Sequence, residues 1–360
     1  MASNALDYIT IKGFKSIASI EKLPLKPVNV VIGPNGSGKS NFIGVFNFLH
    51  AIREGKLRDY VKKAGGAEKL LHFGSKATRE MCFELSFARA TYELKLRSTA
   101  DDALYEYEEE VNPRNGPGNH DSVAVTQEQE TKWDETRKVL LDGLLGWRIY
   151  HFHDTSTSSL MRKTAKVDDN RFLRPDGANL PAFLYYLKEK HAGSYSLIVR
   201  TVQRVTPFFD DFQLEPLGLS PDDIKLEWRH KNSDQYFDAS SLSDGTLRFI
   251  ALATLFLQPE QFRPSVILVD EPELGLHPYA LEMLAALVRQ ASVKTQVIVS
   301  TQSSLLLDHF EPSDVLVANR VNDGTVLTRL ESPQLAKWLE DYSLGQLWEK
   351  NEFGGRPVPA

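Results

Sequence analysis

The sequence predicts an α/β fold in which two distant stretches of chain form one core and the region between them is inserted. Three observations predict this arrangement. A glycine-rich turn, residues 33–40, directly follows the strand-like run 28–32. A second apolar run, residues 266–269, ends in two adjacent acidic residues. Around that run, residues 242–310 alternate helix-like and strand-like stretches, which is typical of a parallel sheet covered by helices.

Composition sets broad limits on the protein. The chain has 360 residues, of which 42% are hydrophobic and 25% charged, and this suits one large domain with an insertion, or two domains. A net charge of −6 argues against a broadly cationic nucleic-acid surface, although a local basic patch stays open. We expect no signal peptide, and the longest apolar run, residues 249–257, is too short to cross a membrane. The sequence therefore predicts a cytoplasmic protein with no membrane partner.

The single cysteine, Cys82, excludes a disulfide within the chain and fits a reducing compartment. It lies in the strand-like run 81–87. We therefore expect a buried structural thiol at this position rather than a nucleophile.

Residue patterns predict the elements in order along the chain. β-Branched runs predict strands at 7–11 and 28–32, and apolar residues at helical spacing predict a helix over 40–52. The middle of the chain predicts strands over 81–97, 103–111, 147–152 and 224–228, a turn near 98–102, a helix over 126–145 and a helical pair over 179–206. The last third predicts helices over 243–257, 278–291 and 303–309, strands over 265–269 and 296–300, and a hairpin of strands 314–319 and 325–329 turning at Asn322-Asp-Gly324.

The turn after the second strand is a complete phosphate-binding loop. Gly33-Pro-Asn-Gly-Ser-Gly-Lys-Ser40 matches the pattern G-x-x-x-x-G-K-[ST], in which backbone N–H groups surround the β-phosphate of ATP. Lys39 would supply charge for the β- and γ-phosphates, and Ser40 would offer its hydroxyl to Mg²⁺. The residues expected to bind the phosphates are Asn35, Gly36, Ser37, Gly38, Lys39, Ser40 and Asn41.

Two carboxylates follow the buried-type strand 266–269. Asp270 would lie at the carboxyl end of a parallel sheet, where a ligand for Mg²⁺ is expected. Glu271 points to the other face and could polarise the attacking water. The sequence therefore predicts a P-loop NTPase site that uses ATP and Mg²⁺, with Glu271 as its catalytic carboxylate.

A third motif, Ser243-Asp-Gly-Thr246, begins a helix ahead of that strand. Taken alone, Ser243 is an ordinary helix cap. Its place between the phosphate loop and Asp270 instead favours a contact between this helix N-terminus and the γ-phosphate of ATP. The resulting organisation has three parts: a bipartite ATP-binding core of residues 1–97 and 242–330, an inserted helical and β lid of residues 98–241, and a C-terminal helix and tail of residues 331–360.

With these motifs in this order, the chain resembles the ABC-type ATPase heads shared by structural-maintenance-of-chromosomes (SMC) proteins, RecF and the OLD family. It most resembles stand-alone bacterial ATPases that are often found with phage-defence genes. The resemblance extends to the runs 151–156 and 270–278. It implies a P-loop, ABC-ATPase-like head with mixed sheets, and a homodimer that forms around ATP. Because the insertion contains prolines and glycines, we expect that it cannot form the long coiled coil of the chromosome proteins.

The resemblance also implies roles for particular residues. Ser243, Asp244, Gly245 and Thr246 of one protomer would contact the γ-phosphate held by the phosphate loop of the other. Glu273 and His277 match the D-loop, which couples the two sites. Lys15, in Phe14-Lys-Ser16, matches a basic residue that approaches the nucleotide.

Two departures from the family pattern affect the expected chemistry. The switch histidine of the family falls on Gln302, which can hydrogen-bond a phosphate or water but cannot carry a proton, so we expect slow turnover. No glutamine occurs between Phe42 and Thr126, so the usual Q-loop residue is missing or displaced. His72, Ser75 or a water would then take its place near Mg²⁺.

Weaker signals leave alternatives open. His151 and His153 would share one face of a strand beside Asp154, either as a metal pair or as ordinary surface residues. Two basic runs, one within 53–69 and one in the insertion, are expected to face solvent. Contact with nucleic acid is the alternative for both. The second run comprises Arg162, Lys163, Lys166, Arg171 and Arg174.

Together these features predict a slowly hydrolysing ATPase that dimerises around Mg·ATP and gates a separate effector, a nuclease or toxin, in phage defence or DNA repair. Two alternatives remain. The chain could be a nucleic-acid clamp that ATP locks, or a non-hydrolysing scaffold for a partner nuclease or toxin.

Overall fold

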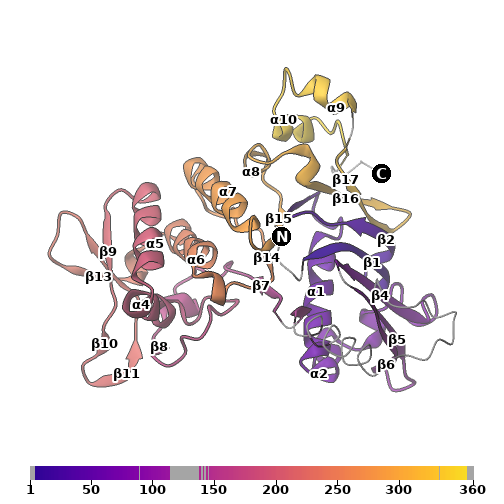
Figure 1. Ribbon diagram of the computed structural model, residues 1–360, viewed down its shortest axis with the longest axis horizontal. Helices are drawn as coiled ribbons and strands as arrows, with labels where there is room; N and C mark the ends of the chain where they lie inside the picture. Colours follow the sequence, from indigo (N-terminus) through magenta and orange to yellow (C-terminus); the bar gives the residue numbers. More distant parts are fainter. Residues whose placement is uncertain are drawn as a thin grey trace. The chain divides into compact units, whose positions relative to one another are not determined.

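The computed structural model describes residues 5–88, 90–113, 146–331 and 333–354, together with residues 138, 141, 143 and 144. The chain forms two compact units, the first of Met1–Trp147 and Glu311–Ala360 and the second of Arg148–Phe310 (Figure 1). The predicted helix over 126–145 and the tail after Gly354 lie largely outside the described residues. The predicted bipartite core with an inserted lid stays a prediction, because the two units are distinguished by compactness alone.

The first unit contains an antiparallel sheet with the strand order β2-β1-β4-β5-β6. Its strands are β1 (Leu6–Phe14), β2 (Ile17–Pro24), β4 (Glu80–Phe87), β5 (Ala90–Ser98) and β6 (Leu104–Pro113). The single strand expected over 81–97 is wrong, because the chain reverses between β4 and β5 and pairs Ser86 with Thr91. The sequence around this reversal has no Gly, Pro, Asn or Asp to signal a turn.

The same unit carries the strand and helix that flank the glycine-rich turn. Strand β3 (Val28–Ile32) runs parallel to β16 (Val315–Val321), which pairs antiparallel with β17 (Gly324–Arg329). Asn322 and Asp323 have φ values of 47° and 63°, as a two-residue hairpin turn requires, so the predicted hairpin is confirmed. The predicted first helix is confirmed as α1 (Lys39–Arg53), followed by α2 (Leu57–Ala64).

In the second unit, β14 (Val266–Asp270) is flanked by two parallel strands, β15 (Gln296–Thr301) and β7 (Arg148–Tyr150). Every residue of β15 and the first four of β14 are buried, which confirms the predicted fully covered parallel strand. Helices α6 (Asp244–Leu257) and α7 (Pro278–Ser292) follow the predicted boundaries, and α8 (Ser304–Leu307) is shorter than expected.

The rest of the second unit combines a helical pair with short strands. The pair is α4 (Leu180–Lys190) and α5 (Ala192–Val205), as predicted. The strands form two small antiparallel sheets: β8 (Ala165–Lys166), β10 (Pro216–Leu217) and β11 (Ser220–Ile224), and β9 (Phe209–Gln213), β12 (Glu227–His230) and β13 (Tyr236–Asp238). The continuous strand expected over 224–228 is wrong, because β11 ends and β12 begins within it and the two belong to different sheets.

Short helices complete both units. They are α9 (Pro333–Trp338), α10 (Leu344–Glu349), and the 3₁₀ turns η1 (Ala67–Lys69), η2 (Leu160–Arg162), η3 (Ala239–Ser241), η4 (Glu260–Phe262) and η5 (Pro312–Asp314). Over the described residues, the longest helices have 15 residues, far short of a coiled-coil arm. Within the same residues, no helix combines the length and the hydropathy needed to cross a membrane.

The thiol of Cys82 should react slowly in the folded protein. Burial, together with the nearby Glu93 carboxylate, raises the pKa of Cys82 from 9.0 to about 11. The reactive thiolate fraction near pH 8 therefore falls about a hundredfold. We expect iodoacetamide to alkylate the folded chain about a hundredfold more slowly than the urea-unfolded chain, measured by mass spectrometry. Equal rates would show that this thiol is not perturbed.

Candidate nucleotide-binding site

The glycine-rich turn after β3 has the backbone of a phosphate-binding loop. Gly36 and Gly38 have φ values of 80° and 100°, a region that side-chain-bearing residues rarely adopt. Asn35, Gly36 and Ser40 are exposed, whereas Ser37 and Lys39 are buried. The Lys39 ammonium donates to the carbonyl oxygens of Gly33 (2.7 Å) and Pro34 (3.1 Å). The loop therefore has its lysine folded against its own backbone.

Helix α1 begins in a way that suits an anion. Its N-cap is Gly38, and among the described residues no side chain caps the helix start. No acidic residue lies in its first turn. The positive end of a helix with uncapped N–H groups attracts phosphate, and the Ser40 hydroxyl is exposed in this first turn.

A chain of hydrogen bonds supports the loop from below. Thr325 Oγ1 donates to the Ser37 carbonyl at 2.9 Å and lies 2.7 Å from Ser16 Oγ. Because the Thr325 proton is used on Ser37, the Ser16 hydroxyl must donate to Thr325. Asn41 Nδ2 donates to Ser16 Oγ at 2.6 Å. Donation therefore runs in one direction, from Asn41 through Ser16 and Thr325 to the loop carbonyl.

Thr325 also explains why Gly38 must be glycine. A β-carbon at Gly38 would overlap the Thr325 side chain, which is buried beneath the loop at the start of β17. Sequence reasoning missed Thr325, since nothing in the local pattern of a hairpin strand points to a residue nearly 300 positions earlier. A side chain that contacts the loop across this separation can be found only from the fold.

The remaining expected residues of the first unit have local partners. Lys15 adopts φ 49°, its ammonium lies 5.5 Å from the Phe14 ring centroid, and burial lowers its pKa. His72 Nδ1 lies 2.7 Å from the Lys15 carbonyl, and Ser75 Oγ donates to Glu68. An approach of Lys15 to the nucleotide, and a Q-loop role for His72 or Ser75, stay predictions.

The second unit presents the predicted carboxylates at the carboxyl end of β14. Asp270 pairs in register with Ser300 of β15, and Glu271 leaves the strand with φ 41°. Asp270 Oδ1 is buried without a hydrogen-bond partner among the described residues. A buried, unpartnered carboxylate oxygen is costly unless a cation or donor meets it, so Asp270 fits a Mg²⁺ ligand.

Gln302 hydrogen-bonds two acidic residues of the turn that follows β14. Its amide Nε2 donates to Glu271 Oε1, and its backbone N–H donates to Glu273 Oε1 at 2.9 Å. Glu273 is 9% exposed, and its burial raises its pKa. The structure thus brings the predicted catalytic residues Glu271 and Gln302 into direct contact, while their catalytic roles stay predictions.

The Ser243 motif forms a capped helix start, as predicted. Ser243 is the N-cap of α6, and its Oγ accepts from the Thr246 N–H at 3.1 Å. A β-carbon at Gly245 would overlap the Gly275 carbonyl oxygen. Gly245 therefore allows the backbone of this loop to pack directly on the turn after β14. We call Leu242–Thr246 the signature loop.

The turn after β14 leads into α7 through His277. His277 Nδ1 accepts from the Tyr279 N–H at 3.3 Å and caps α7. His277 is exposed, whereas Glu273 is buried. The two residues expected in the D-loop thus differ in surroundings, and their coupling role stays a prediction.

His151 and His153 do not lie on a strand face. Strand β7 ends at Tyr150, so the expected alternation of His151 and His153 along a strand is wrong. Their ring centroids are 6.0 Å apart, and His153 Nε2 donates to the Asp270 carbonyl at 2.7 Å. Among the described residues, no group of three or more His, Cys, Asp or Glu side chains could hold a metal ion.

Comparison with known proteins places the chain in a family. Residues 28–308 match the AAA_21 family, described as "AAA domain, putative AbiEii toxin, Type IV TA system". The chain belongs to this family. The match includes both the phosphate loop of the first unit and the carboxylates of the second. Membership and motifs together identify a P-loop ATPase of the ABC and SMC-head class, which implies ATP binding.

Two curated relatives match over shorter stretches. One is the chromosome partition protein Smc of Mycolicibacterium paratuberculosis, 40% identical over 63 residues, or 16% of this chain and 5% of that protein. The other is the "Putative ABC transporter ATP-binding protein GSU1281" of Geobacter sulfurreducens, 28% identical over 145 residues, or 35% of this chain and 56% of that protein. The alignments thus span 5% and 56% of the two relatives' lengths.

Solved structures show the fold. An Smc head bound to the C-terminal winged-helix domain of ScpA has a TM-score of 0.62 and 16% identity, covering 92% of this chain and 99% of that chain. An Smc head from Pyrococcus furiosus, with an extended coiled coil and bound to the C-terminal domain of ScpA, has a TM-score of 0.56 and 15% identity, covering 93% and 98%. The predicted α/β ABC-like head fold is therefore confirmed.

The Thr325 hydroxyl should support nucleotide binding. The isosteric change Thr325→Val leaves the Ser37 carbonyl and Ser16 without their partner, which would loosen the loop. We expect about fivefold weaker ATP binding with an unchanged circular dichroism spectrum. Isothermal titration calorimetry measures the affinity, and Thr328→Val, at an exposed position of the same strand, is the matched control. Equal affinities for all three proteins would contradict the role of the hydroxyl.

Glu273 should make stability depend on pH. Its pKa in the folded chain is raised above its ordinary value of 4.5, so its stabilising contribution is fully present below that value and is lost as the pH rises through the folded pKa. Glu273→Gln removes this loss while keeping an acceptor for Gln302. We expect the variant to gain stability relative to wild type as the pH rises above about 5, measured as urea midpoints. Glu282→Gln, on the exposed face of α7, should show no such pH-dependent difference.

Proposed function

We propose that this chain binds Mg·ATP between two copies of itself, hydrolyses it slowly, and thereby controls a separate effector. The observation that carries the proposal is the contact between the Gln302 amide and the Glu271 carboxylate. A carboxylate held in this way can act as the general base that activates water. Gln302 can orient Glu271 and the water but cannot relay a proton, so we expect slow turnover.

We propose that the phosphate loop and the β14 carboxylates act on the same nucleotide. The loop residues from Asn35 to Asn41 would bind the phosphates, with Lys39 supplying charge. Ser40 and Asp270 would hold Mg²⁺, which supplies positive charge to the phosphate oxygens when bound. The unpartnered Asp270 Oδ1 and the uncapped start of α1 support this assignment.

We propose that a second copy completes the site through the signature loop. Ser243 is exposed at the N-terminus of α6, and the packing of Gly245 against Gly275 joins this loop to the turn after β14. In that turn Leu274 is 41% exposed, so a second copy that meets the signature loop would also cover this side chain. Ser243, Asp244, Gly245 and Thr246 would then reach the γ-phosphate bound by the other copy, with Glu273 and His277 beside them.

The effector in this proposal is another protein chain. The family description names a putative AbiEii toxin and a Type IV TA system, which supports a toxin as that partner, and a nuclease is the alternative. Closure of two ATPase copies is a two-state change that such a partner could sense. The proposed context is phage defence or DNA repair.

ATP should drive two copies together when hydrolysis is blocked. Glu271→Gln removes the general base and retains the ATP-bound state, so we expect Mg·ATP to shift its mass from one protomer to two. Light scattering measures this mass with and without nucleotide. Adding Ser243→Arg to this variant should abolish the shift, since the bulky arginine side chain would block the approach of the signature loop to the γ-phosphate.

Controls separate binding from assembly. Lys39→Ala should lose both ATP binding and the shift, whereas the Ser243→Arg double variant should keep ATP binding. A shift that survives Ser243→Arg would contradict a site completed by the signature loop. A monomer that binds ATP but never associates would instead favour the nucleic-acid clamp or the scaffold.

A further inference from the structure

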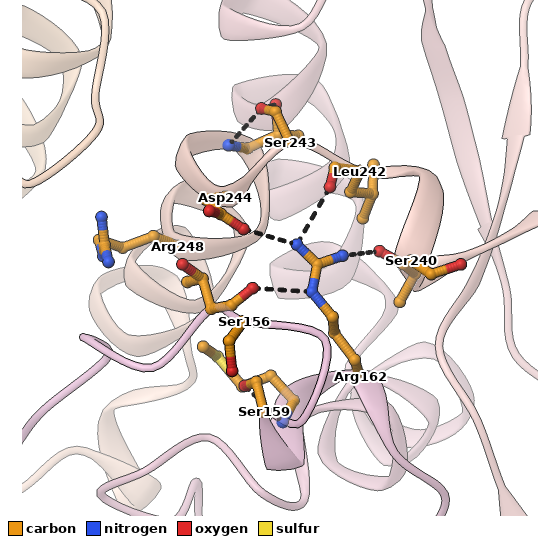
Figure 2. A network of polar contacts seen from close by, with 12 residues as sticks. Ser156, Ser159, Arg162, Ser240, Leu242, Ser243, Asp244 and Arg248 are labelled. Carbon is orange, nitrogen blue, oxygen red and sulfur yellow. Dashed lines mark hydrogen bonds and ion pairs between the residues drawn. The ribbon is translucent and has the colours of Figure 1, made fainter.

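One arginine makes an unusual set of contacts at the start of the signature loop (Figure 2). The Arg162 guanidinium donates to the carbonyl oxygens of Thr155 (2.9 Å), Ala239 and Leu242 (3.1 Å), and to Asp244 Oδ1 (2.9 Å). Its side chain is only 6% exposed, whereas the Asp244 side chain is 64% exposed. The sequence placed Arg162 in a solvated basic run, and for this residue that expectation is wrong.

These contacts join the start of the signature loop to the segment that carries Arg162 itself. Ala239, Leu242 and Asp244 lead into α6, and Thr155 belongs to the run 151–156 that the ATPase motifs leave unexplained. Three of the four acceptors are backbone carbonyls. The arginine therefore fixes the path of the chain into the loop rather than the rotamer of one side chain.

The segment that carries Arg162 is itself braced. Ser156 Oγ donates to Asp154 Oδ1 and Ser159 Oγ to the Asp154 carbonyl, both at 2.6 Å. Met161 is fully buried, and a β-carbon on Gly177 would come within 2.7 Å of its side chain. Arg162 thus extends from a rigid base, which is what a residue needs to hold another loop in place.

The other end of this segment is tied to α6 and to β14. Arg248, 5% exposed, donates to the carbonyls of Phe152 (2.8 Å) and His153 (2.9 Å). The His153 ring in turn donates to the Asp270 carbonyl. The run 152–162 therefore connects the N-terminal part of α6 to the strand that carries the carboxylates, within one unit of the chain.

We propose that Arg162 is a positioning residue that holds the signature loop in the shape needed to contact the ATP of a second copy. It touches no nucleotide itself and acts through Leu242, Ser243 and Asp244. This inference rests on the proposed function, because it assigns Arg162 to the half-site that one protomer supplies to the other. Disturbing Arg162 then damages the site of the partner and spares the phosphate loop of its own chain.

The first test separates nucleotide binding from assembly. Arg162→Gln removes the charge and most of the donors, and we expect unchanged affinity for a fluorescent ATP analogue at protein concentrations where the chain is monomeric. In the Glu271→Gln background we expect the dissociation constant of the ATP-driven dimer to rise at least about tenfold. Arg162→Lys, which keeps the charge but not the fork of donors, should lie between wild type and Arg162→Gln. Lys163→Gln, an exposed neighbour of equal charge, should behave as wild type.

The second test asks which site is damaged. Arg162→Gln and Lys39→Ala are each assayed alone, at a concentration too low for Arg162→Gln to dimerise, and then mixed in equal amounts, and ATP hydrolysis is measured each time. Only a mixed dimer would hold an intact site, one of its two, so we expect hydrolysis to recover to at most about one quarter of the wild-type rate, the value for random pairing. The reference mixture is Ser243→Arg with Lys39→Ala, and Arg162→Lys replaces Arg162→Gln if the latter does not fold.

The outcomes distinguish the inference from the proposed function. Recovery in both mixtures supports the positioning role of Arg162. Recovery only in the reference mixture overturns it, because Arg162 would then act on its own nucleotide or on folding, while the shared site stands. Recovery in neither mixture overturns the shared site, and the inference falls with it. Loss of monomeric ATP binding in both Arg162 variants also overturns the inference.

Discussion

Polar groups that follow the four buried residues of β14 are costly to leave unpaired, and several contacts of the second unit pair them, although Asp270 Oδ1 has no partner among the described residues. The Gln302 amide and backbone N–H bind Glu271 and Glu273. His153 binds the Asp270 carbonyl and is carried by a segment that Arg248 ties to α6. Buried polar groups of this kind are costly when unpaired. The same bonds that stabilise the interior therefore also fix the positions of the candidate catalytic groups.

In the first unit, hydrogen bonds must likewise stabilise the phosphate loop. A loop that offers its N–H groups to an anion cannot also use them to stabilise itself, so its support must come through its carbonyls and side chains. Lys39 and Thr325 provide donors to the Gly33 and Ser37 carbonyls. The loop is held from beneath, and its exposed face is left for the ligand.

Membership in the AAA_21 family and similarity to Smc heads explain the shared parts of this molecule, and the departures indicate how it differs. Glutamine at position 302 keeps a donor beside Glu271 but removes a group that could titrate near neutral pH. Among the described residues, helices of at most 15 residues replace the arm seen in chromosome proteins. A head of this type is suited to slow switching through a bound partner, which is the function we propose.

The sequence alone determined the phosphate loop, the buried strand with its two carboxylates and the Ser243 cap, because each depends on residues that are neighbours in the chain. Local patterns also located most helices and the hairpin at Asn322. Only the tertiary structure decided the contacts of Thr325 and Arg162, since each donates to backbone carbonyls far away in sequence. The same limit explains the misread reversal before Ala90, where strand pairing rather than turn residues sets the boundary. Contacts between distant segments leave no periodic or compositional trace, so they appear only when the chain is folded.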